Sequence, residues 1–363
     1  MGKLCLVGYS LEDVNIIPAV STSIDHRCEP NPFTEICGME SYPIFVAPMG
    51  AVTDENNYGK WIENKLTPVI PRSVGTRLSV ANRLKLAETT FVSLSLSEFK
   101  AFSETEYEDY ENTKYICVDL ANGHMETLID TCKYVKEKLK DKIVIMTGNI
   151  ANPETYRLYC DAKIDYVRVG IGGGSRCTTS ANVGVHYPMA TLLDKINDVR
   201  MGISGFKTKV VADGGIYNFD DINKCLAIGA DAVMIGRVFA ECEEACGEVL
   251  YSISEEAFNN GIGYTKEQIG NIDAPIKSGF KPYRAYYGMS TKQAQKETGG
   301  NGDKTAEGIS RPVVVRYPVA KWVDNMQSNL RSGMSYLNAN TLKDMWNSEF
   351  IILGCSGDHS YRK

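Results

Sequence analysis

The stretch KVVADGGIYNFDDINKCLAIGADAVMIGRVF, residues 209–239, decides the fold class because it holds one complete strand–helix–strand unit. Its two ends, residues 209–215 and 232–239, are short apolar runs with β-branched residues, as buried parallel strands are. Between them apolar side chains recur at helical spacing, with Asn218 placed to cap the helix and Gly229 to end it. The stretch therefore predicts a βαβ unit of a parallel sheet.

The same unit recurs through the preceding part of the chain. Six further apolar runs of this kind occupy residues 43–49, 67–74, 89–96, 115–121, 142–149 and 166–172. The clearest helix between them is residues 125–140, whose lysine-rich end suits a helix C-terminus. Eight strand–helix repeats over about 200 residues predict an α/β fold, the (β/α)8 TIM barrel. A doubly wound open sheet is the alternative, since its repeats look alike locally.

The domain organisation follows from the same pattern. No domain boundary is visible, so we expect residues 1–363 to form a single barrel domain. Residues 290–312 have little to bury, and we expect them to be a mobile flap. Beyond the flap, residues 311–319 predict a strand and residues 321–337 a helix.

The composition is that of an ordinary globular protein, with 43% hydrophobic and 23% charged residues. A net charge of -6 without blocks of like charge argues against nucleic acid as the main partner. No stretch approaches the ~20 apolar residues of a membrane span, and the first residues do not form a signal peptide. The 11 scattered cysteines therefore predict free thiols in a reducing cytoplasm.

The cysteines and histidines form no metal-binding motif. Cys242 and Cys246 are the closest cysteine pair, and their spacing fits one face of a helix. Structural zinc usually has four ligands, and no second pair lies near in sequence. We therefore expect no zinc site there.

In a barrel, the chemistry gathers where the strands end, at their C-terminal side. Asp213-Gly214-Gly215 and Gly236-Arg237 follow the seventh and eighth strands, where barrels often bind phosphate through loop amides. Arg237 would add a charge-assisted contact, and Asp213 would accept hydrogen bonds from ribose hydroxyls. The alternative is two glycine turns and a surface arginine.

Cys177 ends a glycine loop that follows the sixth strand. A thiol in this position can attack an electrophilic carbon when amides or a charged neighbour lower its pKa. The alternative is a small buried residue, as free cysteines often are. The other ten cysteines are assigned to that second class.

The loop GIGGGSRCTT, residues 170–179, resembles the active-site loop of the IMP dehydrogenase and GMP reductase family. Other segments resemble the family in the same order, namely LEDVNIIPAVS (11–21), KYICVDLANGH (114–124), TGNI (147–150), VVADGGI (210–216), AVMIGRVFA (232–240), YYGMS (286–290) and AEGIS (306–310). The family fold is the (β/α)8 barrel, in agreement with the count of repeats.

The resemblance implies a chemistry for these segments. Cys177 would attack carbon 2 of a purine nucleotide, and a nicotinamide cofactor, NADPH or NAD, would carry hydride to or from that carbon. Thr179 and Glu307 match the residues that handle the departing or attacking group. Family members commonly form homotetramers, and the resemblance implies the same here.

The resemblance also implies binding residues. Those for the substrate are Met49, Ser175, Asp213, Gly214, Gly215, Gly236, Arg237, Tyr287, Gly288 and Met289. Those for the cofactor are Asp119, Asn122, Gly123, Gly148 and Asn149. The backbone carbonyls of Gly172, Gly174 and Cys177 match a potassium site.

Two features favour the reductase branch, in which GMP loses ammonia and accepts hydride from NADPH to give IMP. The chain has no CBS insertion between barrel strands, and the flap before Glu307 lacks the Arg-Tyr pair of dehydrogenases. The pair Arg316-Tyr317 follows Glu307 instead, and we expect it to be a strand arginine with a packed tyrosine. Alternatives are a CBS-less IMP dehydrogenase that oxidises IMP to XMP with NAD, a non-catalytic purine-nucleotide-binding homologue, and a flavin-dependent barrel oxidoreductase.

Four positions depart from the family pattern. Gly50 replaces an acid, Gly173 replaces the proline of reductases, and Arg237 stands where a small residue is usual. Pro318-Val319 stands in place of a Lys-Gly step. These departures leave room for a purine nucleotide other than GMP.

Overall fold

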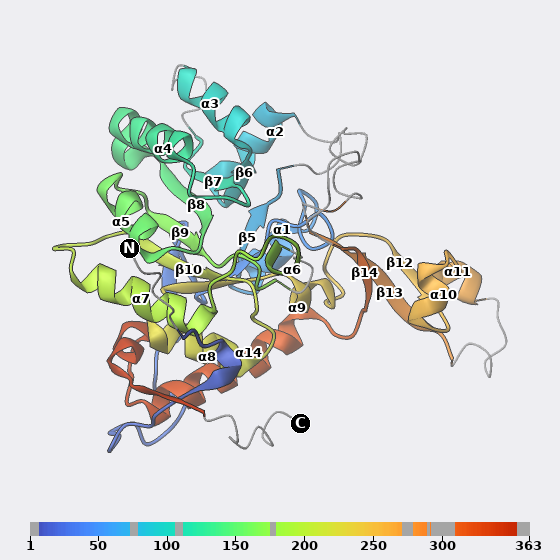
Figure 1. Ribbon diagram of the computed structural model, residues 1–363. Coiled ribbons are helices and arrows are strands. Elements are labelled where there is room, and N and C mark those ends of the chain that lie inside the picture. The colour runs from blue at the N-terminus through green and yellow to red at the C-terminus, as the bar shows by residue number, and fades with distance from the viewer. Residues whose placement is uncertain are drawn as a thin grey trace.

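A computed structural model describes residues 7–72, 79–105, 112–174, 179–270, 279–288, 291 and 309–353. Its centre is a closed barrel of eight parallel strands, each paired with the next along the chain and the last with the first (Figure 1). The strands are β4 (Ile44–Val46), β5 (Thr67–Ile70), β6 (Phe91–Leu94), β7 (Tyr115–Asp119), β8 (Val144–Ile150), β9 (Tyr166–Val169), β10 (Lys209–Asp213) and β11 (Ala232–Ile235). Each coincides with one of the eight apolar runs, so the (β/α)8 barrel is confirmed and the open sheet is excluded.

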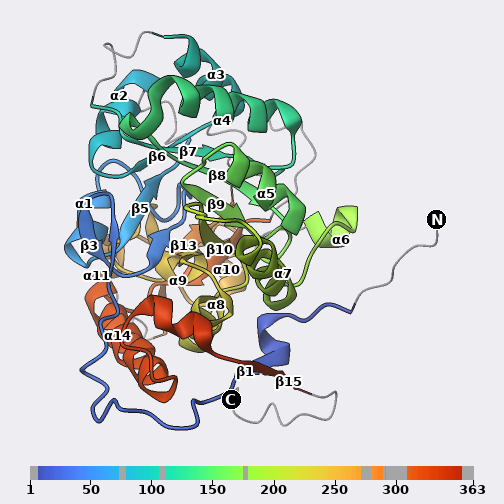
Figure 2. The ribbon, with the colours of Figure 1, turned by 90° about the vertical axis from the view of Figure 1, so that its left-hand side faces the viewer.

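Helices surround the barrel, and α5, α7, α8 and α14 pack side by side on its outside (Figure 2). The α-helices are α1 (Tyr58–Glu63), α2 (Val80–Leu84), α3 (Leu96–Glu104), α4 (Glu126–Leu139), α5 (Pro153–Asp161), α6 (Thr179–Val183), α7 (Met189–Met201), α8 (Phe219–Ile228), α9 (Arg237–Ala240), α10 (Glu255–Asn259), α11 (Lys266–Gly270) and α14 (Val319–Tyr336). Short 3-10 helices are η1 (Leu11–Asp13), η2 (Lys85–Glu88), η4 (Lys140–Lys142) and η5 (Leu342–Asn347).

The helix predicted within residues 209–239 is α8, and its ends are where the sequence placed them. Asn218 precedes the helix in extended conformation, and its amide donates to Asp221 Oδ2 at 3.0 Å. Gly229 ends the helix at a φ of +127°, which favours glycine. The helix predicted at residues 125–140 is likewise confirmed as α4.

The barrel interior is filled in layers by inward-facing side chains. One layer holds Phe45, Phe91 and Tyr166, whose rings meet edge to face with centroids 5.6–5.7 Å apart. Successive inward residues of a strand lie two positions apart. The layer nearer the C-terminal ends therefore receives Asp119 after Cys117 on β7, Arg168 after Tyr166 on β9, and Asp213 after Val211 on β10. The apolar lower layers thus carry charged residues at the barrel mouth.

A three-stranded antiparallel sheet lies beside the barrel, at the right of Figure 1. It consists of β12 (Val249–Ser252), β13 (Lys281–Tyr286) and β14 (Arg311–Val314). The strand predicted at residues 311–319 is confirmed only in its first part. The expectation that Arg316 is a strand residue is wrong, because its amide donates to the Glu241 carbonyl at 2.9 Å and Pro318 then leads into α14. The helix predicted at residues 321–337 is confirmed as α14.

The segments near the two chain ends are paired with each other. β1 (Val14–Ile16) runs antiparallel to β15 (Phe350–Ile352), with Val14 opposite Ile352 (Figure 2). A hairpin of β2 (Thr34–Ile36) and β3 (Met39–Ser41) sends Ile36 into the inner cluster of the barrel.

The eight cysteines within the described ranges are free thiols. The expectation that Cys242 and Cys246 share a helix face is wrong, because α9 ends at Ala240 and both cysteines lie in the non-helical segment that follows. The Cys246 thiol donates to the Gly50 carbonyl at 3.0 Å. In the described residues no group of three or more His, Cys, Asp or Glu side chains is arranged for a metal ion. None of the helices described is long and apolar enough to cross a membrane.

Candidate active site

Two glycine turns meet at the mouth of the barrel, one after β9 and one after β10. A Cβ atom on Gly170 would lie 2.2 Å from the Asp213 carbonyl oxygen, and one on Gly214 would lie 3.1 Å from the Gly174 amide nitrogen. Both residues also have positive φ values, +124° and +98°. Glycine is therefore required for the two backbones to touch. This contact brings Gly174, the last described residue of the cysteine loop, against the turn that carries Asp213.

A cavity of about 170 Å³ opens beside this contact, and we call it the glycine cavity. It lies where β4, β9, β10 and β11 end. The predicted substrate residues that line it are Met49, Asp213, Gly214, Gly215, Gly236, Arg237 and Gly288. The structure thus gathers these residues, predicted from four separate segments, around one opening.

Tyr286 completes the glycine cavity, and the sequence did not single it out. Its hydroxyl donates to Met49 Sδ at 3.4 Å. A Cβ atom on Gly236 would lie 2.7 Å from that sulfur and 2.9 Å from the Tyr286 hydroxyl oxygen. Gly236 therefore leaves the room in which Met49 and Tyr286 meet. The predicted neighbour, Tyr287, is buried in the same core cluster as Tyr286 but does not line the cavity.

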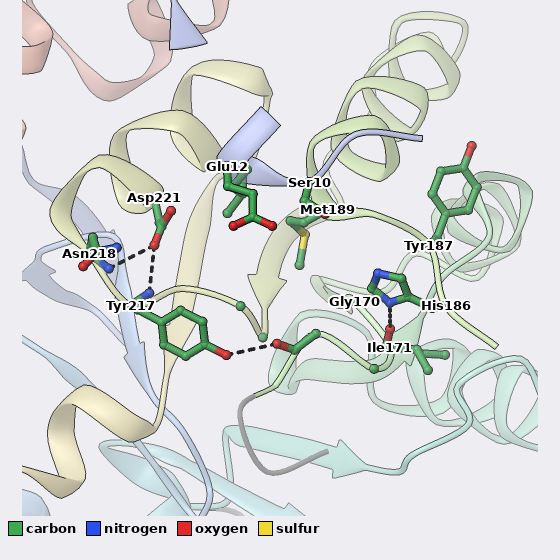
Figure 3. Close-up of a pocket in the computed structure, with 15 residues that line it drawn as sticks. Ser10, Glu12, Gly170, Ile171, His186, Tyr187, Met189, Tyr217, Asn218 and Asp221 are labelled. Atoms are coloured by element: carbon green, nitrogen blue, oxygen red, sulfur yellow. Dashed lines mark hydrogen bonds between the residues drawn. The ribbon is translucent and has the colours of Figure 1, made fainter. Parts of the chain in front are cut away.

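A second opening, of about 250 Å³, lies on the other side of the two glycine turns (Figure 3). His186 Nδ1 lies 2.6 Å from the Ile171 carbonyl oxygen, and the Tyr217 hydroxyl donates to the Gly173 carbonyl at 3.3 Å. Both interactions hold the glycine loop from outside (Figure 3). The Gly172 carbonyl, predicted to bind potassium, accepts a hydrogen bond from Ser180 Oγ at 3.3 Å.

A buried arginine joins the predicted substrate and cofactor residues. Arg168 Nη1 lies 2.6 Å from Asp119 Oδ1, and its Nη2 lies 2.7 Å from Asp213 Oδ2. Asn149 Nδ2 donates to the same Asp213 oxygen at 2.8 Å, and Arg72 Nε lies 3.3 Å from Asp119 Oδ2. We call these five residues the charged network. Sequence reasoning missed Arg168, although an arginine inside the apolar run YVRVGIG was a signal.

The charged groups of the network stabilise one another in their ionised forms. Burial would raise the pKa of Asp119, but Arg168 and then Arg72 outweigh it, and the pKa lies below its usual value. Burial likewise opposes the charge of Arg168, but Asp213 and Asp119 outweigh it and raise its pKa above the usual value. Asp119 and Arg168 are therefore ionised near neutral pH.

The predicted cofactor residues stand on the β7 and β8 side of this network. The Gly123 amide donates to the Asn149 carbonyl at 2.8 Å, and a Cβ atom on Gly123 would lie 2.7 Å from that oxygen. A Cβ atom on Gly148 would lie 2.5 Å from the Arg168 carbonyl oxygen. Asn122 is exposed at the rim, where its Oδ1 accepts from the His124 amide at 3.1 Å. These residues form one side of the barrel mouth next to Asp213.

Several predicted residues lie outside the described ranges, namely Ser175, Cys177, Met289 and Glu307. Thr179 is the first residue of α6, and its side chain is not described. Of the predicted flap, residues 290–312, the structure describes residue 291 and residues 309–312.

Three thiols elsewhere in the fold are kept protonated by their surroundings. Burial raises the pKa of Cys117 to about 11, although Arg168 Nη1 lies 3.8 Å from its sulfur. Burial also raises the pKa of Cys132 and of Cys246 to about 12. None of the three is a thiolate near neutral pH, so each is a poor nucleophile.

Comparisons with known proteins agree with this architecture. A model described as the IMP dehydrogenase / GMP reductase domain matches residues 109–359. A GMP reductase of Buchnera aphidicola subsp. Baizongia pistaciae is 33% identical over 234 residues, 64% of this chain and 58% of the relative. A GMP reductase of Onchocerca volvulus is 33% identical over 64% of this chain and 56% of its own length. One of Vibrio campbellii is 31% identical over 69% of this chain and 67% of its own length.

The match to the first two relatives spans less than two thirds of their length. The family model, in contrast, covers well over half of this chain and includes β9, β10 and β11, three of the four strands whose ends form the glycine cavity. The chain therefore belongs to the IMP dehydrogenase / GMP reductase family.

Proposed function

We propose that the protein is a GMP-reductase-like enzyme that converts GMP, or a related purine nucleotide, into IMP. The glycine cavity carries this proposal, because Gly214, Gly215 and Gly236-Arg237 lie at the ends of β10 and β11, where barrels bind phosphate. Asp213 on its wall would accept hydrogen bonds from ribose hydroxyls. The relatives' name, GMP reductase, supports the same assignment.

In this proposal the thiolate of Cys177 attacks carbon 2 of GMP. The amino group at that carbon leaves as ammonia, and a covalent thioimidate remains. The departing amino group takes up a proton, and Glu307 and Thr179 take part in this proton transfer. NADPH, when bound, supplies a hydride to carbon 2. The bond to sulfur then breaks, which returns the thiolate and releases IMP.

The charged network has a defined part in this reaction. Arg168 fixes the Asp213 carboxylate, and Asn149 donates to the same oxygen, so the ribose partner keeps one orientation. Asp119, Asn122 and Gly123 would hold the nicotinamide side of NADPH, with Gly148 and Asn149 between the two ligands. These residues fit such a group, because Asn122 is exposed at the rim of the barrel mouth.

Three further features belong to the proposal. Potassium would bind carbonyls of Gly172, Gly174 and Cys177. Its entry would displace the Ser180 hydroxyl, whose 3.3 Å bond to the Gly172 carbonyl is long for an O–H donor. We also propose a cytoplasmic homotetramer.

The test is the product formed by purified protein with each substrate and cofactor pair. With GMP and NADPH as the pair, we expect the protein to oxidise NADPH, which is measured as a fall in NADPH absorbance. The expected products are IMP and ammonia. Cys177→Ala should abolish turnover and keep GMP binding. If the protein oxidises IMP with NAD and does not reduce GMP, it is an IMP dehydrogenase. Saturable GMP binding without any turnover would show a non-catalytic homologue, and a yellow protein would show a flavin enzyme.

A further inference from the structure

A large cavity next to the glycine cavity has no part in the reaction described above. Its volume is about 720 Å³, and it lies between α8, α9 and α14, which neighbour one another in Figure 1. Arg237, Arg316 and Lys321 line it, and we call it the basic cavity. These three residues come from α9, from the segment after β14 and from the first turn of α14.

The basic cavity has an excess of positive charge on a chain whose net charge is -6. Among the described residues that line it, Glu241 is the one carboxylate, and Arg316 Nε lies 3.1 Å and Arg237 Nε 3.8 Å from its oxygens. Lys321 makes no ion pair within the part of the chain that the structure describes. One carboxylate thus faces three cations, and the arginine side chains remain 45% and 60% exposed. A ligand with more than one negative charge would neutralise the net positive charge of this wall.

The floor of the basic cavity is rigid. Trp322 is buried and packs edge to face on Phe239, with ring centroids 4.9 Å apart, and its ring also contacts Phe219 at 5.6 Å. The Tyr317 hydroxyl donates to the Val238 carbonyl at 3.2 Å. Arg316 and Lys321 therefore project from fixed backbone, which lowers the entropy lost when they bind a ligand.

The two cavities share a boundary. Tyr217 and Arg237 line both, and the Arg237 guanidinium carbon lies 6.0 Å from the centre of the Tyr217 ring. An anion bound at Gly214 and Gly215 would have Arg237 on one side, and beyond it the basic cavity opens toward Arg316 and Lys321. A chain of phosphates that starts in the glycine cavity would therefore continue into the basic cavity.

We propose that the basic cavity binds the terminal phosphates of a purine nucleoside diphosphate or triphosphate whose first phosphate lies in the glycine cavity. This inference rests on the proposed function for the place of the nucleotide. Guanidinium groups form paired bonds with phosphate oxygens, and each such contact is stronger than a neutral hydrogen bond. The protein then prefers GDP or GTP to GMP, whether as substrate or as a competing ligand.

The experiment is calorimetric titration of the full chain with GMP, GDP, GTP and inorganic tripolyphosphate at low salt. Wild type should bind GTP about tenfold or more tightly than GMP, as expected from at least one added charge-assisted contact. The double variant Arg316→Gln/Lys321→Gln should lower the affinity for GTP to that for GMP and leave the affinity for GMP unchanged. Glu241→Gln should tighten GTP binding, because it removes the carboxylate that competes for both arginines. A matched control, Lys266→Gln/Lys281→Gln, removes two charges from the outlying sheet region and should change nothing.

Each outcome separates this inference from the proposed function. Equal affinity for GMP, GDP and GTP overturns the inference, and if GMP is still reduced by NADPH the proposed function stands. Tripolyphosphate binding that disappears in the double variant, without binding of any purine nucleotide, overturns both the inference and the proposed function. A preference for GTP that survives in the double variant also overturns the inference.

Discussion

Arg168 and Asp213 form an ion pair at the mouth of the barrel, with Nη2 2.7 Å from Oδ2. The arginine side chain is 8% exposed, and its Nε donates to the same oxygen at 3.1 Å. The aspartate lies on the glycine cavity, so the orientation of a candidate substrate-binding carboxylate depends on a residue from the neighbouring strand.

Replacing this arginine should destabilise the fold. Arg168→Met leaves Asp213 and Asp119 without their buried cation, and the loss of one partner of such a pair costs about 3–5 kcal/mol. Urea unfolding followed by circular dichroism measures the change. The control is Arg157→Met, which removes an exposed pair with Glu154 and should cost less than about 1 kcal/mol. Equal, small effects of the two variants would show that the charged network adds little to stability.

Acid should weaken the network through Asp119. Its pKa in the folded state lies below the unfolded value, so its contribution is complete above the ordinary aspartate pKa of about 4 and is lost as the pH falls through the folded value. The difference in unfolding free energy between wild type and Asp119→Asn should therefore shrink on acidification below about pH 4. Urea titrations between about pH 3 and 7 measure it. A difference independent of pH would show that the carboxylate charge does not contribute.

Filling the space at Gly236 should damage nucleotide binding more than folding. The added methyl of Gly236→Ala would press on Met49 and the Tyr286 hydroxyl, both at the edge of the glycine cavity. We expect the dissociation constant for GMP to rise about tenfold, since a displaced contact of this kind costs about 1.4 kcal/mol. Gly59→Ala is the control, because a Cβ atom there has nothing within 4 Å. The control should keep GMP affinity and gain about 0.5–1 kcal/mol of stability from helix α1.

The acid–base role assigned to Glu307 gives a fourth prediction. Glu307→Gln keeps the shape of the side chain and removes its charge, and loss of one such group lowers turnover about 100- to 10,000-fold. GMP affinity, measured by titration, should change much less. Glu255→Gln, at an exposed position on α10, is the matched control and should leave both turnover and GMP affinity unchanged. Unchanged turnover in Glu307→Gln would remove this residue from the mechanism.

The sequence predicts the barrel well because the signal for a buried parallel strand is local. Short runs rich in β-branched residues mark all eight strands, and Asn218 and Gly229 mark the ends of α8. The strands β12 and β13 were missed, because β12 is only four residues long and β13 interrupts its apolar residues with charged ones. Lys281, Pro282 and Arg284 lie within β13, and its pairing with a strand about 30 residues earlier is a long-range property that no local pattern shows.

The site was harder to predict where it depends on the register of distant strands. Arg168 was counted with an apolar run, because only closure of the barrel turns it inward between Asp119 and Asp213. For the adjacent pair Tyr286 and Tyr287, the orientation of β13 decides which ring reaches the cavity, and it is Tyr286. The basic cavity combines residues as far apart in the chain as Tyr217 and Lys321, so no motif could reveal it.

The antiparallel pair of β1 and β15 fastens the entry and exit of the barrel domain to each other. The chain enters β1 beside the point where it leaves β15, and the Leu353 amide donates to the Asp13 carbonyl at 2.8 Å. A short linker across this pair would make the backbone circular in effect. New termini could then be cut at the turn of Gly261, outside every barrel strand, and a circular permutant would retain the eight-stranded core with its mouth undisturbed.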